Sequence, residues 1–311
     1  MTDLDGRRCL VLGAGGFIGT NLCRALAAQG ARVQGFGRRL QYPKALDGIP
    51  QTIGDFADRT QLARIVEGQE IVFHLFGGPR IASETPFGVL ADIVSSVNLL
   101  EICRISGVRK IIFVSSGGAI YGVPSVLPIP ETAVTDPISA YGISKLAVEK
   151  YLHLYRHLYG LEYTALRLAN PYGPFQSATR GQGVVPALLH RVLSGEAVEI
   201  WGTGGIIRDY IYIDDVTDAL IAAIDYQGPC RVFNIGSGIG RSVLQIIEDI
   251  RLILGRRNID RVFRPGRATD VPVNVLDIGL IRDHLGWMPR TEWFDGLRET
   301  SSWLQSSQPA A

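Results

Sequence analysis

What this sequence lacks limits what the protein can do. No basic segment leads into an apolar one at its start, and no apolar run approaches the ~18 residues of a membrane-spanning helix. Lysine and arginine number 31 against 30 acidic residues, so there is no excess charge with which to hold nucleic acid or an anionic membrane. We therefore expect a soluble, cytoplasmic protein that binds neither.

Metal-binding patterns are also missing. The four cysteines form no CxxC pair, and the five histidines have no spacing typical of a metal site. We interpret the cysteines as free thiols and predict that the protein binds no metal.

The first half of the chain does contain a regular alternation of short, β-branched stretches with longer helical ones. Gly30, Gly68, Gly107 and Gly160 end the helical stretches. This alternation predicts the α/β class and a doubly wound parallel sheet of the Rossmann type. We expect strands over 9–12, 32–36, 51–53, 71–75, 110–114 and 163–167, and helices over 16–29, 60–67, 89–106 and 140–159.

After Asn170 this regular pattern loosens, and glycine and proline become frequent. We predict a Rossmann domain from residues 1–170 and about 206–235, and a smaller, mixed, substrate-binding lobe from 171–205 and 236–311. The helices expected here span 184–193, 215–226, 242–254, 278–285 and 294–304.

A glycine-rich loop follows the first predicted strand. Residues 13–19 read Gly-Ala-Gly-Gly-Phe-Ile-Gly and lead into a helix. Glycine allows the tight turn and the close approach of a phosphate, and the helix N-terminus attracts the pyrophosphate. The loop therefore predicts a dinucleotide site built from Gly13, Gly16, Phe17, Ile18 and Gly19.

The type of dinucleotide stays open. The second strand is followed by Gly37, Arg38 and Arg39, with no acid for the ribose hydroxyls. The two arginines suit the 2′-phosphate of NADP, but they are also compatible with NAD if Arg38 stacks on adenine or both face solvent. Asp55, after the third strand, is predicted either to receive the adenine amino group or to cap the next helix.

Tyr141 and Lys145 lie one turn apart on the same face of a predicted helix. A nearby ammonium favours the phenolate, so we expect Lys145 to lower the pKa of Tyr141. Such a tyrosine takes a proton from a sugar hydroxyl while a nicotinamide takes the hydride. The alternative is a pair of exposed side chains without a catalytic role.

With these residues the chain resembles the extended short-chain dehydrogenase/reductase family, in its NAD-dependent epimerase/dehydratase branch. Within that branch it is similar to nucleotide-sugar 4-epimerases of the UDP-glucose and UDP-N-acetylglucosamine kind. Further motifs that carry the resemblance lie at 72–75, 167–174, 202–204, 208–211 and 234–238.

The resemblance implies a UDP-hexose or UDP-N-acetylhexosamine as substrate and NAD as cofactor, supported by Leu75, Asn98 and Ser115. It implies a homodimer through a four-helix bundle from 89–106 and 140–159. The residues implied in substrate binding are Asn170, Arg208 and Arg267 for the phosphates, Trp201 for uracil unless it only packs in the lobe, and Asn274 for the sugar. Asn274 leaves room for an N-acetyl group beside C2, or only bonds the backbone of its loop.

One position departs from the family. Gly117 stands where the family has a catalytic serine or threonine. Either Ser116 or a water replaces that hydroxyl, or the site is impaired. The acid pair of the family's dehydratases would fall at Gly118 and Ala119, which argues against a dehydratase. Two alternatives to the epimerase therefore stay open: an NADPH-dependent reductase of a nucleotide keto-sugar, and a non-catalytic dinucleotide-binding protein.

Overall fold

A seven-stranded parallel sheet forms the centre of the computed structural model, which describes residues 4–77, 86–178, 183–266 and 271–307. The strand order is β10-β6-β5-β4-β1-β2-β3, and neighbours are parallel throughout. The chain changes direction across the sheet between β1 and β4, where doubly wound proteins bind ligands. The strands are β1 (Arg8–Leu12), β2 (Arg32–Gly37), β3 (Gln51–Ile53), β4 (Ile71–His74), β5 (Lys110–Ser116), β6 (Tyr163–Leu168) and β10 (Val232–Ile235).

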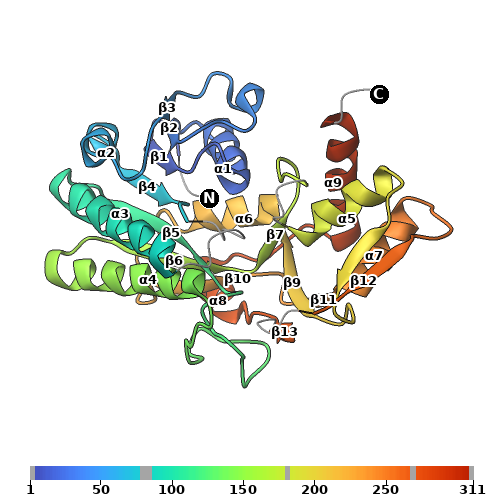
Figure 1. Ribbon diagram of the computed structural model, residues 1–311. Helices are drawn as coiled ribbons and strands as arrows, with labels where there is room; N and C mark the ends of the chain where they lie inside the picture. The colour runs from blue at the N-terminus through green and yellow to red at the C-terminus, as the bar shows by residue number, and fades with distance from the viewer. Residues whose placement is uncertain (1–3, 78–85, 179–182, 267–270, 308–311) are drawn as a thin grey trace.

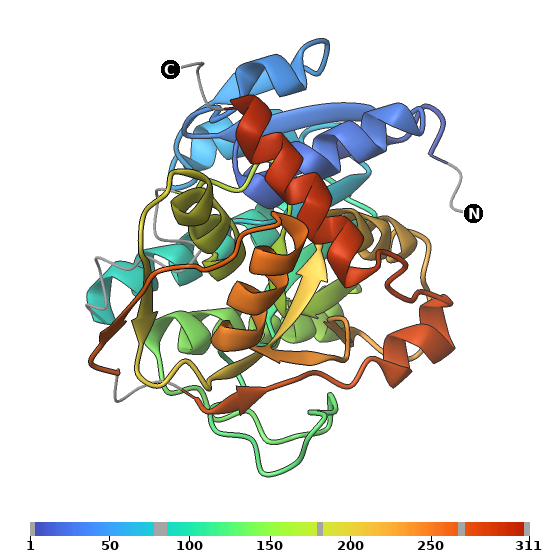
Figure 2. The same ribbon diagram turned by 90° about the vertical axis from the view of Figure 1, so that its right-hand side faces the viewer.

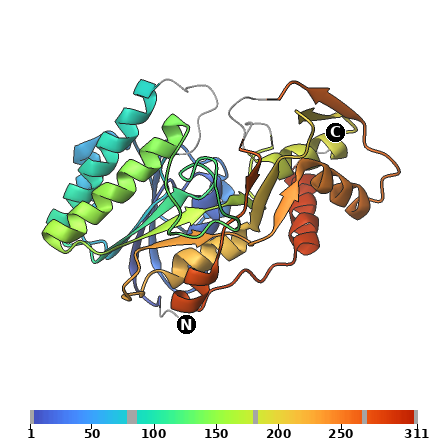
Figure 3. The same cartoon turned by 90° about the horizontal axis from the view of Figure 1, so that it is seen from below.

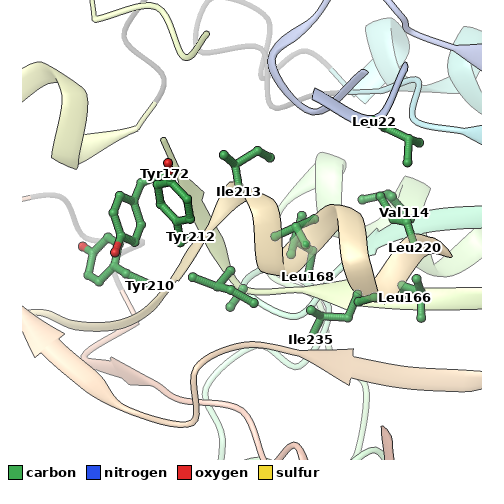
Figure 4. Close-up of a cluster of buried hydrophobic side chains, with 14 of the residues drawn as sticks. Leu22, Val114, Leu166, Leu168, Tyr172, Tyr210, Tyr212, Ile213, Leu220 and Ile235 are labelled. Atoms are coloured by element: carbon green, nitrogen blue, oxygen red, sulfur yellow. The ribbon is translucent and has the colours of Figure 1, made fainter. Parts of the chain in front are cut away.

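Helices cover both faces of this sheet, which confirms the predicted fold class (Figure 1). Successive strand residues alternate between the faces: Val11 packs in the core on one side and Leu12 in the core on the other. The first core includes Leu22 and Leu220, which approach the sheet in Figure 4. It is covered by α1 (Phe17–Ala28) and α6 (Ile213–Ala222), and the second core by α2 (Arg59–Val66), α3 (Pro86–Ile105) and α4 (Ala140–Tyr159).

Smaller sheets and the helices α5 (Val184–Leu193), α7 (Val243–Ile253) and α9 (Trp293–Ser307) form the C-terminal lobe (Figure 2). A mixed four-stranded sheet contains β7 (Asn170–Tyr172), β9 (Ile207–Tyr212), β11 (Gly240–Ser242) and β13 (Val273–Asn274). A separate pair joins β8 (Val198–Trp201) to β12 (Arg261–Arg264). Helix α8 (Gly279–Leu285) packs instead on β10 of the large sheet, and a 3-10 turn, η1 (Pro43–Leu46), follows β2.

The two parts are joined by a continuous segment. Strand β9 lies within the range 206–235 that we predicted for the Rossmann domain, but it pairs in the smaller sheet. It leads directly into α6, which packs against the large sheet through Ile213 and Leu220 (Figure 4). The strand that carries Arg208 is therefore attached rigidly to the dinucleotide domain.

Helix α4 places the predicted catalytic pair. It begins after Ser139, whose hydroxyl accepts the N–H of Gly142, and it ends at Gly160, which has a left-handed φ of 71°. These limits put Tyr141 in the first turn and Lys145 in the second. None of the helices in the described part of the chain is long and apolar enough to cross a membrane.

Candidate active site

The glycine-rich loop needs glycine for steric reasons at three positions. Gly13 has a φ of 94°, which other residues rarely adopt. A Cβ atom on Gly15 would lie 2.0 Å from the carbonyl oxygen of Arg39, and one on Gly19 would lie 2.1 Å from that of Gly13. Sequence reasoning did not single out Gly15, because its neighbour is 24 residues further along the chain and only the fold brings the two together.

The start of α1 is open to an anion. Gly16 is its N-cap and provides no side-chain cap, and its first turn contains no acidic residue. Gly16 is exposed, and Phe17 and Ile18 are half-buried. Leu75 lies against the loop, with its Cβ 3.4 Å from a Cβ placed on Gly13. An uncapped helix N-terminus beside a glycine cradle fits the pyrophosphate of a dinucleotide.

The residues predicted to hold the adenosine half lie at the surface. Arg38 and Arg39 are exposed at the end of β2. Asp55 accepts the N–H of Ala57, whereas α2 is capped by Asp58. The interpretation of Asp55 as the helix cap is therefore wrong, and its contact with adenine stays a prediction.

Tyr141 meets Ser116 at the end of β5. A hydrogen bond to Ser116 lowers the pKa of Tyr141, but the larger effect is burial, which raises this pKa to about 12. The hydroxyl of Ser116 is thus in contact with the phenol, as we expected if it replaces the missing family serine.

Lys145 is buried, and its Nζ lies over the ring of Tyr141, 5.8 Å from the ring centroid. The Nζ donates to the carbonyls of Phe76 and Val114, each at 2.9 Å. Burial lowers the pKa of Lys145 to about 7. The expectation that Lys145 lowers the pKa of Tyr141 is wrong for this structure, because the ammonium donates to carbonyls and the phenol pKa follows from burial and the bond to Ser116.

Gly117 is explained by packing. A Cβ at this position would lie 2.5 Å from Cδ1 of Leu276, a core residue, and 3.1 Å from the carbonyl of Arg167. A Cβ at Gly118 would meet nothing closer than Oγ of Ser116, at 4.0 Å. The family hydroxyl is absent because β13 and the residues after it pack directly on this loop.

Ser115 makes a structural contact, and its predicted contact with the cofactor stays a prediction. Its side chain points to the opposite side of β5 from that of Ser116, and its hydroxyl donates to Glu149. Glu149 forms a buried salt bridge of 2.7 Å with Arg167, which also donates to the hydroxyl of Tyr121. The Ser115 hydroxyl is therefore committed to a buried ionic network.

The predicted substrate residues lie on three neighbouring strands. Asn274 on β13 is in register with Arg208 on β9, and Asn170 on β7 pairs with Tyr210, two residues further along β9. Backbone carbonyls hold the three side chains: Asn170 donates to Asp209 (2.9 Å), Arg208 to Ile207 (2.9 Å) and Val271 (2.6 Å), and Asn274 to Gly117 (3.1 Å).

One alternative expected the side chain of Asn274 to bond the backbone of its own loop. It instead bonds the backbone of Gly117, in the loop after β5. Its Oδ1 is buried and has no hydrogen-bond partner. Trp201, 46% exposed, ends β8 on the separate two-stranded sheet. Arg267 lies outside the described residues.

Asp92 is a site residue that the sequence analysis missed. A small cavity beside Lys145 is lined on α3 by Asp92 and Ser96, together with Phe76 and Gly77. Asn98, which we predicted in this role, lies about 9 Å further along the helix and about a third of a turn around it. The structure therefore places Asp92 beside Lys145, and the predicted contact of Asn98 with the cofactor stays a prediction.

Comparison with known proteins agrees with this geometry. A family model described as the NAD dependent epimerase/dehydratase family matches residues 9–236. The chain belongs to this family. A UDP-glucose 4-epimerase of Mycolicibacterium smegmatis is 34% identical over 310 residues, which cover 96% of this chain and 99% of the relative.

Solved structures of similar proteins cover nearly the whole chain. The UDP-glucose 4-epimerase of Thermotoga maritima with UDP-glucose has a TM-score of 0.90 at 36% identity, over 96% of this chain and 99% of that one. The Thermus thermophilus UDP-glucose 4-epimerase with NAD has a TM-score of 0.89 at 31% identity, over 97% and 100%. A UDP-N-acetylglucosamine 4-epimerase of Methanobrevibacter ruminantium, in complex with UDP-N-acetylmuramic acid, has a TM-score of 0.87 at 28% identity, over 98% and 100%.

These matches confirm the predicted family and an NAD-dependent enzyme of the epimerase type. They give no support to NADP, so the exposed Arg38 and Arg39 are better interpreted as residues that face solvent or adenine. In the part of the chain that the structure describes, no three histidine, cysteine or acidic side chains are placed to hold a metal ion.

Proposed function

We propose that this NAD-dependent enzyme is a nucleotide-sugar 4-epimerase that acts on a UDP-hexose or a UDP-N-acetylhexosamine. The observation that carries the proposal is the contact between Ser116 and Tyr141 beside the buried Lys145, at the sheet edge that also holds the glycine loop. The similarity to UDP-glucose and UDP-N-acetylglucosamine 4-epimerases supports the choice of substrate.

In this proposal the protein moves a proton and positions the sugar. In its ionised form, which the positive charge of a bound nicotinamide would favour, Tyr141 takes the proton of the C4 hydroxyl and later returns it, and Ser116 holds the phenol in place through their hydrogen bond. Bound NAD would supply the redox chemistry, as the acceptor and then the donor of the hydride at C4 of the sugar. The amides of the loop and of the start of α1 would hold its pyrophosphate.

The small sheet would hold the nucleotide. Arg208 is anchored by two carbonyls, which orient its guanidinium, and a guanidinium matches the geometry of phosphate oxygens. Asn170 is anchored on the same strand. Asn274, which is buried and donates to the carbonyl of Gly117 next to Ser116, would act on the sugar through this loop.

Conversion of each UDP-sugar into its 4-epimer, followed by proton NMR, tests the function directly. Purified protein should convert UDP-glucose or UDP-N-acetylglucosamine without added cofactor and without net oxidation or reduction of NAD. Tyr141→Phe should lower turnover by roughly 10²–10⁴-fold, the usual contribution of a positioned acid–base group, and should leave NAD binding intact. Net consumption of NADPH with a nucleotide keto-sugar, and no epimerisation, would instead support the reductase.

We also propose a homodimer formed through α3 and α4. Figure 3 shows these helices side by side at the outer edge of the molecule. Their outer faces expose large apolar side chains, an arrangement typical of a protein interface. These side chains are Leu90, Val94 and Ile105 on α3 and Ile143, Tyr151, Leu154, Leu158 and Tyr159 on α4.

A further inference from the structure

The surroundings of the Lys145 ammonium include an acid that no step of the proposed mechanism uses. A Cβ atom placed on Gly77 would lie 3.5 Å from Nζ of Lys145 and 3.8 Å from Oδ2 of Asp92. The ammonium and the carboxylate therefore flank the same point from opposite helices, α4 and α3. Both also line the small cavity at this place.

The other charged and titratable groups that face Lys145 do not balance its charge. Glu149, one turn along α4, is already paired with Arg167 at 2.7 Å. Burial and the Lys145 charge lower the pKa of His74 on β4, so this histidine stays neutral. Tyr141 is a neutral phenol below its pKa of about 12. Asp92 and, to a smaller extent, Glu149 are therefore the acids that favour the charged form of Lys145.

A chain of buried hydrogen bonds fixes the position of Asp92. The N–H of Phe76 points to Nδ1 of His74 at 3.4 Å, and Nε2 of His74 bonds Oγ of Ser96 at 2.9 Å. Ser96 in turn donates to the carbonyl of Asp92 at 2.7 Å. Because the carbonyl of Phe76 also accepts from Lys145, this chain connects the backbone of α3 at Asp92 to the residue that the ammonium contacts.

We propose that Asp92 is a positioning residue, whose carboxylate is held opposite Lys145 across Gly77 so that the ammonium stays charged and directed at the site. Burial opposes the charged form of a lysine, and a nearby carboxylate favours it. The consequence for turnover rests on the proposed function, but the effect on the charge of Lys145 does not.

The titration of Lys145 in Asp92→Asn tests this role. The chain has only four lysines, Lys44, Lys110, Lys145 and Lys150, so the ε-carbon NMR signals of ¹³C-labelled lysine are few, and Lys145→Arg assigns the one of interest. In the full-length protein we expect the pKa of Lys145 to lie near 7 and to fall by about one unit in Asp92→Asn. Lys110 is the internal control and should titrate unchanged.

Two further measurements separate the role of Asp92 from a general structural effect. Ser96→Ala should shift the titration of Lys145 in the same direction by a smaller amount, because the carboxylate remains but is held less firmly. Glu101→Gln, which removes an acid from the same helix, should leave the titration unchanged. An unchanged pKa of Lys145 in both Asp92→Asn and Ser96→Ala would overturn the proposal.

Turnover distinguishes this proposal from the proposed function. If the charged Lys145 supports catalysis, the ratio of wild-type kcat to that of Asp92→Asn should approach about ten above pH 8 and about one toward pH 5, since one unit of pKa is a tenfold change in the charged fraction. A shifted titration in a protein that epimerises no UDP-sugar would leave the role of Asp92 standing and contradict the function.

Discussion

At the residue scale, Ser115 and Ser116 are neighbours in sequence with different surroundings. Ser116 contacts the phenol of Tyr141, and Ser115 donates to the buried Glu149. Ser116→Ala should therefore lower turnover by about tenfold or more and change stability little. Ser115→Ala should keep turnover and lower the free energy of unfolding by about 1 kcal/mol. Steady-state kinetics and urea unfolding of both variants check this, and equal effects on turnover would show that Ser116 has no special role.

Gly117 and Gly118 offer a second matched pair. Gly117→Ser would push Leu276 out of its place in the core, so it should lower the free energy of unfolding by about 1–3 kcal/mol. Gly118→Ser meets only open space and should be close to neutral. Leu276→Ala combined with Gly117→Ser should cost less than the sum of the two changes, because the clash is removed. A fully additive double variant in urea unfolding would contradict this packing argument.

The sequence identified Tyr141 and Lys145 because an i, i+4 spacing on a helix is a local property. The sequence analysis did not identify Asp92. The face of α3 that meets α4 depends on packing between segments that are distant in the sequence. The expected lowering of the Tyr141 pKa by Lys145 was wrong for a related reason. Helical spacing brings the two side chains near each other, but the Lys145 ammonium donates to the carbonyls of Phe76 and Val114.

At the scale of elements, Lys110 ties β5 to the end of α6. Its Nζ donates to the carbonyls of Ala223 and Tyr226, and burial lowers its pKa from 10.5 to about 8. Between pH 8 and 10.5 the unfolded chain holds a proton that the folded protein has released, so through this group the free energy of unfolding rises with pH. The wild type should therefore gain about 3 kcal/mol over Lys110→Met across this range.

Urea unfolding of both proteins at several pH values measures this difference and cancels the titration of other groups. Lys44→Met, which changes an exposed lysine on η1, is the control and should follow the wild type. A constant difference between wild type and Lys110→Met from pH 7.5 to 10.5 would show that the Lys110 ammonium is not desolvated as the contacts imply.

Elements with strong local signals were predicted well. The bounds of α4 agree with the expected 140–159, since Ser139 and Gly160 mark its two ends in the sequence. The short strands of the C-terminal lobe were not predicted. Strand β13 has two residues, too few for a hydrophobic pattern, and it forms only because β9 provides a partner.

At the scale of the whole molecule, the site forms where distant segments meet. The glycine loop, β5 and α4 belong to the large sheet, whereas Arg208 and Asn274 come from the small one. The packing of Leu276 against Gly117 and the bond from Asn274 to the same residue join the two parts beside Ser116, the proposed partner of Tyr141. A change on either side of this contact should therefore affect both substrate binding and turnover.

The last prediction concerns assembly. Leu154 on α4 is 42% exposed and Val94 on α3 is 60% exposed, on the outer face proposed as the dimer interface. The wild type should have twice the mass of one chain in light scattering, and Leu154→Asp with Val94→Asp should give a folded monomer, because charges without partners are costly to bury.

Phe263→Asp is the control: Phe263 is 57% exposed on β12, on the opposite side of the molecule (Figure 3), and its change should leave the dimer intact. A monomeric wild type, or a double variant that still dimerises, would contradict an interface made by α3 and α4.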